Sequence, residues 1–148
     1  MDASEKKKHQ IVVGVDGSAS SKDALRWAAR LAPSLGATID AVVAWEYPLV
    51  FGLDAGVPSA WNPDETAKEI LEKSLEEVFG KDRPAGLVGG ISQGHPTFVL
   101  LEASKEAEML IVGSRGLGGF VGLLLGSVSS ACAEHAHCPV LVVHGEHK

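Results

Sequence analysis

Residues 10–18 read Gln-Ile-Val-Val-Gly-Val-Asp-Gly-Ser. The β-branched run over residues 10–15 is typical of a buried strand, and the Asp-Gly-Ser that follows is typical of a turn leading into a helix cap. Apolar side chains then recur at three- and four-residue spacing, which predicts a helix over about residues 20–35, and Gly36 follows as a helix stop. This stretch therefore predicts a strand, a tight turn and a helix, the first half of a βαβ unit.

The rest of the chain repeats this alternation. Apolar runs without helical spacing predict strands over residues 38–45, 87–92, 109–112 and 139–144. Amphipathic segments predict helices over residues 64–80, from Pro96 onward, and over residues 127–136. Strands that alternate with helices predict one doubly wound, Rossmann-like α/β domain, with a five-stranded parallel sheet and helices on both faces. Ligands of such sheets bind beyond the carboxyl ends of the strands, which here end near Asp16, Ala44 and Gly113.

The length and composition fit one globular domain. The chain has 148 residues, of which 45% are hydrophobic and 22% charged, the usual proportions of a folded chain. We expect residues 1–9 to form a flexible N-terminal tail and residues 10–148 to form the domain. Residues 46–63 hold three prolines and three aromatic side chains without a clear period, which predicts a long loop.

Charge and cysteine usage narrow the possible partners and compartment. The formal net charge of −6 repels phosphate backbones and acidic membrane surfaces, so we expect no nucleic-acid partner and no membrane association. The longest apolar stretch, residues 117–125, is interrupted by three glycines and is too short to cross a bilayer. Cys132 and Cys138 lack a Cys-x-x-Cys spacing, which indicates a reduced protein, and we expect it to be cytoplasmic.

Residues 113–129 connect the fourth strand to the last helix and read Gly-Ser-Arg-Gly-Leu-Gly-Gly-Phe-Val-Gly-Leu-Leu-Leu-Gly-Ser-Val-Ser. Glycines at both ends let main-chain N–H groups approach a ligand without an intervening Cβ, and the second end opens a helix N-terminus. Ser127 and Ser129 add hydroxyl donors, and Arg115 adds a positive charge. A phosphate chain fits these donors. The alternative is a flexible connection whose serines only cap the helix.

This segment resembles the ATP-binding branch of the universal stress protein family. That branch is marked by Gly-x2-Gly-x9-Gly-(Ser/Thr), and Gly113, Gly116 and Gly126-Ser127 stand at those spacings. The Val-Gly-Val-Asp-Gly-Ser after the first strand, the Gly-His-Pro before the third helix and the closing Cys-Pro-Val-Leu-Val-Val also resemble the family. The resemblance covers roughly residues 10–144. It departs at Met109, where many relatives carry an aspartate, and this leaves the glycine motif untouched.

The resemblance implies an ATP site built from the glycine segment and two strand ends. The residues it places along the triphosphate and ribose are Gly113, Ser114, Arg115, Gly116, Gly119, Gly126, Ser127, Val128 and Ser129. Asp16 would lie beside the ribose or beside a phosphate-bound Mg²⁺, and Gly14 would leave room for the nucleotide. Main-chain groups at Ala44 would hold the adenine.

The sequence supports nucleotide binding better than nucleotide turnover. The chain has no Gly-x4-Gly-Lys-(Ser/Thr) sequence, and no carboxylate besides Asp16 is obviously placed to orient a water. The resemblance therefore implies an ATP-binding, nucleotide-dependent regulator of the stress response. Two alternatives stay open: a slow Mg-dependent ATPase that uses the same pocket, and a dimeric interaction module with a vestigial pocket. The histidines and cysteines of residues 132–138 do not match zinc-site spacing.

The last strand is expected to lie at an edge of the sheet. An apolar edge strand leaves main-chain groups unpaired, and a partner usually covers such an edge. Members of the family commonly pair this strand with its twofold mate, so the resemblance implies a homodimer formed through residues 139–144.

Overall fold

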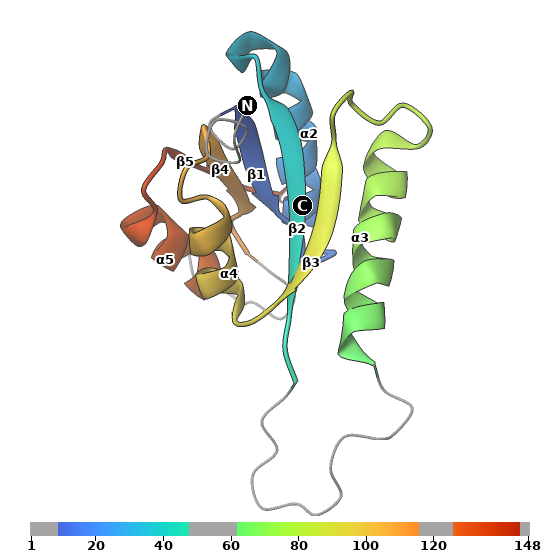
Figure 1. The fold of residues 1–148 in the computed structure, drawn as a ribbon, viewed down its shortest axis with the longest axis vertical. Coiled ribbons are helices and arrows are strands. Elements are labelled where there is room, and N and C mark those ends of the chain that lie inside the picture. The colour runs from blue at the N-terminus through green and yellow to red at the C-terminus, as the bar shows by residue number, and fades with distance from the viewer. Residues whose placement is uncertain (1–8, 48–61, 116–125, 146–148) are drawn as a thin grey trace, which may run out of the picture.

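The computed structural model describes residues 9–47, 62–115 and 126–145. Strands and helices alternate along the chain (Figure 1). The elements are β1 (Gln10–Gly14), α2 (Ala19–Leu35), β2 (Thr38–Trp45), α3 (Pro63–Phe79), β3 (Val88–Gln93), α4 (Pro96–Ala103), β4 (Met109–Gly113), α5 (Ser127–His135) and β5 (Val140–Val143). Each element lies where the sequence predicts it. Most of the expected tail and of the expected loop over residues 46–63 lies outside the described residues.

The strands form one parallel sheet in the order β3-β2-β1-β4-β5. This confirms the predicted five-stranded sheet. The chain first adds β2 and β3 on one side of β1, and it then adds β4 and β5 on the other side. The strand order therefore reverses between β1 and β4, which is where an open α/β sheet binds its ligands.

Helices cover both faces of this sheet, and the strands are buried accordingly. Helices α2 and α3 pack on one face, where Leu25 and Leu75 belong to the same core cluster as Ile11 of β1. Helices α4 and α5 pack on the other, where Leu100 and Cys132 belong to the same cluster as the β1 and β4 side chains that point that way. Successive residues of a strand thus pack into the hydrophobic clusters on opposite faces of the sheet, because side chains alternate across a pleated sheet.

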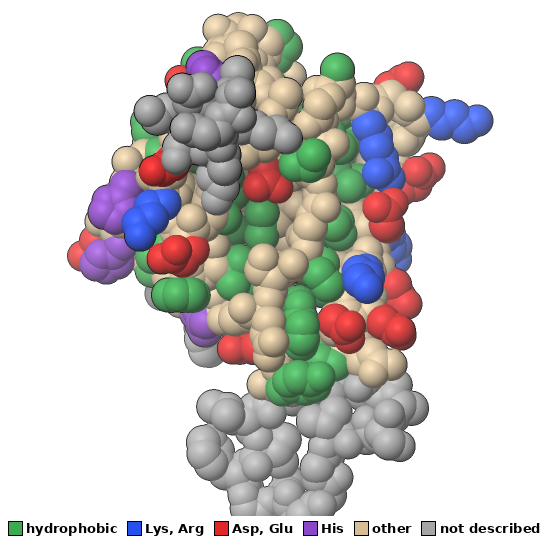
Figure 2. Space-filling view, in the orientation of Figure 1, with side chains coloured by type: hydrophobic (Ala, Val, Ile, Leu, Met, Phe, Trp, Pro, Cys, Tyr) green, Lys and Arg blue, Asp and Glu red, His purple; other side chains and the backbone are tan. Residues whose placement is uncertain are grey.

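The outer surface of α3 carries charged side chains of both signs (Figure 2). One of them, Glu77, forms an ion pair with Lys22 of α2, with 2.6 Å between the carboxylate Oε2 and the lysine Nζ. The lysine lowers the pKa of the Glu77 carboxyl. The exposed acidic residues of α3 therefore face solvent, and Glu77 is also paired with α2.

The ends of α2 are fixed by specific residues. Ser18 is the N-cap, and its Oγ accepts a hydrogen bond from the Ser21 N–H at 3.2 Å. Gly36 ends the helix at φ 61°, in the left-handed region that favours glycine. Because Ser18 follows β1 so closely, the cap also sets where the first turn of α2 lies relative to the end of β1.

None of the helices in the described ranges is long and apolar enough to span a membrane.

Cys132 lies in the core between α5 and the sheet and is fully buried. Burial raises the pKa of its thiol to about 11, and the nearby Cys138 adds to this rise. Burial also raises the pKa of Cys138, against hydrogen bonds from Ser104 and the Leu110 main chain that lower it. The thiols of this core are thus kept neutral.

The Cys132 thiol should make stability depend on pH in the alkaline range. Its folded-state pKa lies above the ordinary value of 9.0, so the unfolded chain loses the thiol proton first as pH rises. The free energy of unfolding should therefore keep its full value below pH 9 and should fall by about 2 kcal/mol as the pH rises toward 11. Urea unfolding at about pH 8 and about pH 10.5 should show a larger loss in the native protein than in Cys132→Ala. An equal loss of stability in the native protein and in Cys132→Ala would contradict the raised pKa of the Cys132 thiol.

Candidate functional site

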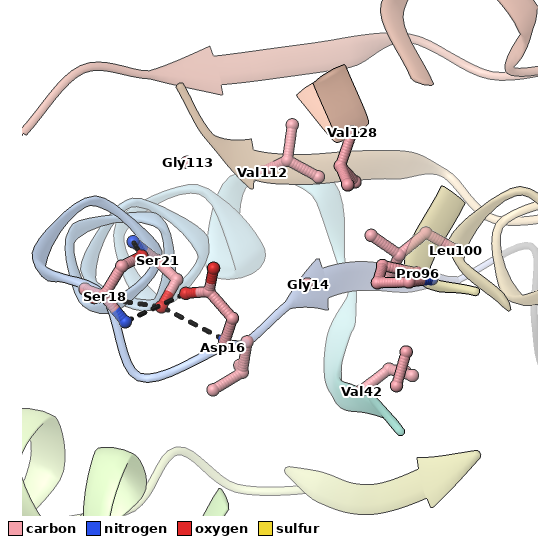
Figure 3. Close-up of a pocket in the computed structure, with 12 residues that line it drawn as sticks. Gly14, Asp16, Ser18, Ser21, Val42, Pro96, Leu100, Val112, Gly113 and Val128 are labelled. Carbon is pink, nitrogen blue, oxygen red and sulfur yellow. Dashed lines mark hydrogen bonds between the residues drawn. The ribbon is translucent and has the colours of Figure 1, made fainter. Parts of the chain in front are cut away.

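A cavity of about 110 Å³ opens at the carboxyl ends of β1 and β4, where the strand order reverses. Its two ends differ in character (Figure 3). Asp16, Ser18 and Ser21 lie together at one end, and Pro96 and Leu100 lie at the other. The cavity thus offers a polar end and an apolar end to one ligand.

Hydrogen bonds hold the polar end in place. The Ser18 N–H donates to Oδ1 of Asp16 at 2.9 Å, and Ser21 Oγ donates to the Ser18 carbonyl at 3.0 Å. Gly17 lies between Asp16 and Ser18 at φ 84°, a conformation that the tight turn requires and that favours glycine. The Asp-Gly-Ser predicted as a turn therefore fixes the Asp16 carboxylate beside the start of α2.

Three helices begin at the cavity. Ser18 is the N-cap of α2, Pro96 is the first residue of α4, and Val128 lies in the first turn of α5, and all three line the cavity. A helix N-terminus carries unpaired N–H groups and a partial positive charge. The convergence of three of them favours an anionic ligand at this place.

The apolar end depends on a close contact between β1 and α4. A Cβ at Gly14 would lie 2.8 Å from Leu100 Cδ1. Glycine therefore lets Leu100 pack over the end of β1, where both residues line the cavity with Val112. The family resemblance implies that the space at Gly14 admits a nucleotide, and in the structure Leu100 takes part of that space.

Ala44 lies where β2 continues past the end of β1. The last paired residues of these strands are Gly14 and Val42, and the Val15 N–H donates to the Val42 carbonyl at 2.9 Å. Two residues further on, the Ala44 main chain points to the same side as that of Val42, because the direction alternates along a strand. Its polar groups therefore face the cavity, which Ala44 lines.

The two ends of the glycine segment are bonded to each other. The Ser114 carbonyl accepts hydrogen bonds from the Gly126 N–H at 2.6 Å and from Ser129 Oγ at 2.9 Å. Ser129 Oγ also donates to the Gly126 carbonyl, and Ser114 and Ser129 are both buried. These two serines, which the sequence analysis places along a phosphate chain, hold the entry and the exit of the segment together.

The structure brings together only part of the predicted site. The predicted residues that line the cavity are Gly14, Asp16, Ala44, Gly113 and Val128. Arg115, Gly126 and Ser127 are described and lie outside that lining, as do Ser114 and Ser129. Gly116 and Gly119 lie outside the described residues.

Sequence reasoning missed much of the lining. The missed residues are Val15, Ser18, Ser21, Val42, Pro96, Leu100 and Val112. Two signals could have found some of them. Val42 shares a strand face with Ala44, and Pro96 opens the helix that follows a neighbouring strand.

Possible metal ligands are dispersed over the part of the chain that the structure describes. Within it, no three side chains of His, Cys, Asp or Glu gather into a group that could hold a metal ion. The His135 side chain is exposed, and its Nε2 lies 3.9 Å from Oε2 of Glu134, whereas Cys132 is buried.

Comparisons with known proteins identify the family and the fold of this chain. The family model described as the universal stress protein family matches residues 8–144. A universal stress protein of Mycobacterium tuberculosis is 35% identical over 149 residues, which cover 95% of this chain and 50% of the relative. One from Mycolicibacterium smegmatis is 37% identical over 92% of this chain and 48% of its own length. The chain thus spans about half the length of the curated relatives it matches.

Solved structures of the family have the same fold. The universal stress protein of Lactobacillus plantarum superposes with a TM-score of 0.71 at 22% identity, covering 93% of this chain and 98% of that one. A universal stress protein solved in complex with cAMP superposes with a TM-score of 0.68 at 27% identity, over the same shares of the two chains.

Gly113 packs against α2 as well as lining the cavity. A Cβ at Gly113 would collide with Ser20 Oγ and would lie 2.8 Å from the main-chain carbon of Ser20. From the sequence, this glycine is expected to serve ligand approach alone. The structure adds a role in packing, so a substitution here should affect the fold even without a ligand.

Gly113→Ala should lower the free energy of unfolding by about 1–3 kcal/mol, because the helix must shift to admit the methyl group. Gly90→Ala in β3 is the matched control, since a Cβ there meets nothing within 4 Å, and its effect should stay within about 0.5 kcal/mol. Urea unfolding of the ligand-free proteins measures both. Equal stability of the two variants would show that Gly113 has no packing role.

Proposed function

The chain belongs to the universal stress protein family, and we propose that its pocket binds ATP together with Mg²⁺. In this proposal the bound nucleotide regulates a cytoplasmic protein in the response to stress. The observation that carries it is a cavity at which three helices begin, polar at the end of Asp16, Ser18 and Ser21 and apolar at the end of Pro96 and Leu100. The structurally similar protein solved with cAMP, at 27% identity, supports an adenine nucleotide as the ligand.

The two ends of the cavity suit the two ends of a nucleotide. The phosphates would lie toward the starts of α2 and α5 and toward Gly113, where helix dipoles favour negative charge. The adenine would lie at the apolar end, against Leu100, with the Ala44 main chain supplying hydrogen bonds to its edge. This arrangement uses each part of the lining for the chemistry it provides.

Asp16 fits a role beside the magnesium ion. Mg²⁺ prefers oxygen ligands and is usually held by one or two carboxylates together with nucleotide phosphates. One carboxylate oxygen of Asp16 accepts the Ser18 N–H, which fixes the carboxylate at the end of the cavity assigned to phosphate. When bound, the ion would neutralise phosphate charge that Asp16 would otherwise repel.

The proposal is one of binding and regulation. Among the described residues that line the cavity, Asp16 alone has an ionisable side chain. Hydrolysis of ATP needs groups that stabilise the charge of the transition state in addition to groups that bind the ground state. Slow hydrolysis therefore remains an outcome that the binding experiment should test.

Val128→Phe should fill the cavity and abolish ATP binding. Val128 lines the cavity in the first turn of α5, whereas Ser130 of the same helix is exposed and lies outside the lining. Ser130→Phe is therefore the matched control and should bind ATP as the native protein does. Calorimetry with ATP and Mg²⁺ measures the affinities, and mass spectrometry identifies any nucleotide that the purified protein releases on denaturation.

The same experiment separates the alternatives. Release of ADP and phosphate during incubation would identify a slow ATPase. If the native protein binds neither ATP nor another adenine nucleotide, the proposal is wrong and the pocket is vestigial.

We further propose that the protein is a homodimer formed through β5. This strand lies at an end of the sheet. The Pro139 and Val143 carbonyls accept hydrogen bonds from the Leu110 and Ser114 N–H groups. Since main-chain direction alternates along a strand, the polar groups of Val142 point away from β4, toward the open edge.

Val142→Pro should convert the dimer to a monomer and keep the fold, because proline at this position removes an N–H that points outward. Leu141→Pro is the contrasting variant. The main chain of Leu141 faces β4, so this proline should break the sheet and lower the helical circular dichroism signal. Analytical ultracentrifugation at micromolar concentration measures the mass. A native protein that sediments as a monomer would exclude the proposed dimer.

A further inference from the structure

Ser20, in the first turn of α2, makes a hydrogen bond to a distant part of the chain. Its Oγ donates to the main-chain carbonyl of Arg115 at 2.6 Å, across 95 residues of sequence. The neighbouring Ser18 and Ser21 use their hydroxyls within the same turn. Ser20 is buried and lies outside the lining of the cavity. Its hydroxyl therefore acts on the end of β4.

Gly113 makes a notch that Ser20 fills, and Gly145 lies beside Ser20 with ordinary van der Waals spacing. A Cβ at Gly113 would collide with Ser20 Oγ, and a Cβ at Gly145 would lie 3.5 Å from Ser20 Cβ. The close approach at Gly113 keeps the helix against the strand end, and the hydrogen bond to Arg115 fixes the next two residues. Serine is small enough for the notch and also supplies the donor.

The same short stretch is held from its other side. The Ser114 N–H donates to the Val143 carbonyl of β5 at 2.8 Å, and the Ser114 carbonyl receives the Gly126 N–H and the Ser129 hydroxyl. Residues 113–115 are thus bonded to α2 on one side and to β5 and α5 on the other. Ser20 is the side chain through which α2 takes part in this hydrogen bonding.

Building on the proposed function, we propose that Ser20 is a positioning residue for the phosphate end of the site. It would act through Arg115, by fixing the main chain of residues 113–115 before the ligand arrives. Gly113 and the start of α2 both line the cavity, and a site whose walls are fixed in advance binds an anion more tightly, because the ligand does not have to order them. The phosphates of ATP should depend on this contact, whereas the nucleoside, held at the apolar end, should not.

The test compares ATP with adenosine on Ser20→Ala. The variant should fold, since alanine is smaller than serine and is the best helix former. Loss of one hydrogen bond should weaken the binding of ATP with Mg²⁺ by about two- to tenfold and leave the affinity for adenosine unchanged. Ser34→Ala, an exposed serine of the same helix, is the matched control and should change neither affinity. Calorimetry measures the affinities for ATP and for adenosine of the native protein and of both variants.

A measurement without ligand separates this inference from the proposed function. In the NMR spectrum of the ligand-free protein, Ser20→Ala should shift the amide signals of residues 114 and 115, and Ser34→Ala should not. If the native protein binds neither ligand, the proposed function fails, and unshifted amides in Ser20→Ala would overturn the contact itself. If ATP and adenosine weaken equally, or if ATP binding is unchanged, Ser20 does not position the phosphate end.

Discussion

The strand β1 is the constraint on which the rest of the fold depends. It pairs with a parallel strand on each side, and its side chains are buried on both faces of the sheet. Parallel neighbours must be joined by crossovers, which brings helices to both faces. Because the chain leaves β1 on one side and returns to it at β4 on the other, the crossovers diverge at this point and leave the cavity at the carboxyl ends of the two strands.

Two glycines adapt the strand ends to the helices beside this cavity. Gly14 accommodates Leu100 of α4 on one face of the sheet, and Gly113 accommodates Ser20 of α2 on the other. The same absence of a side chain that suits a ligand also allows the helices to approach closely. If a variant at Gly14 or Gly113 loses ligand binding, the stability of that variant has to be measured as well.

The sequence predicted the elements and their order because both follow from local periodicity and from the handedness of the connections. It also predicted that Asp16, Ala44 and Gly113 lie near the site, since all three lie at or beside the carboxyl ends of strands in one parallel sheet, and all three line the cavity. Leu100 was missed in this role because its apolar spacing on α4 indicates core packing, and its contact with Gly14 depends on how α4 crosses the sheet.

The serines show most clearly what sequence alone determined and what needed the tertiary structure. The sequence by itself determined that residues 18–21 begin a helix, because serine is a favoured N-cap after a strand and a turn. The sequence could not distinguish Ser20 from Ser18 and Ser21, since all three side chains carry the same hydroxyl group. Only the packing of α2 against the end of β4 decided that the Ser20 hydroxyl reaches Arg115, because a hydrogen bond across 95 residues depends on the positions that the whole sheet imposes.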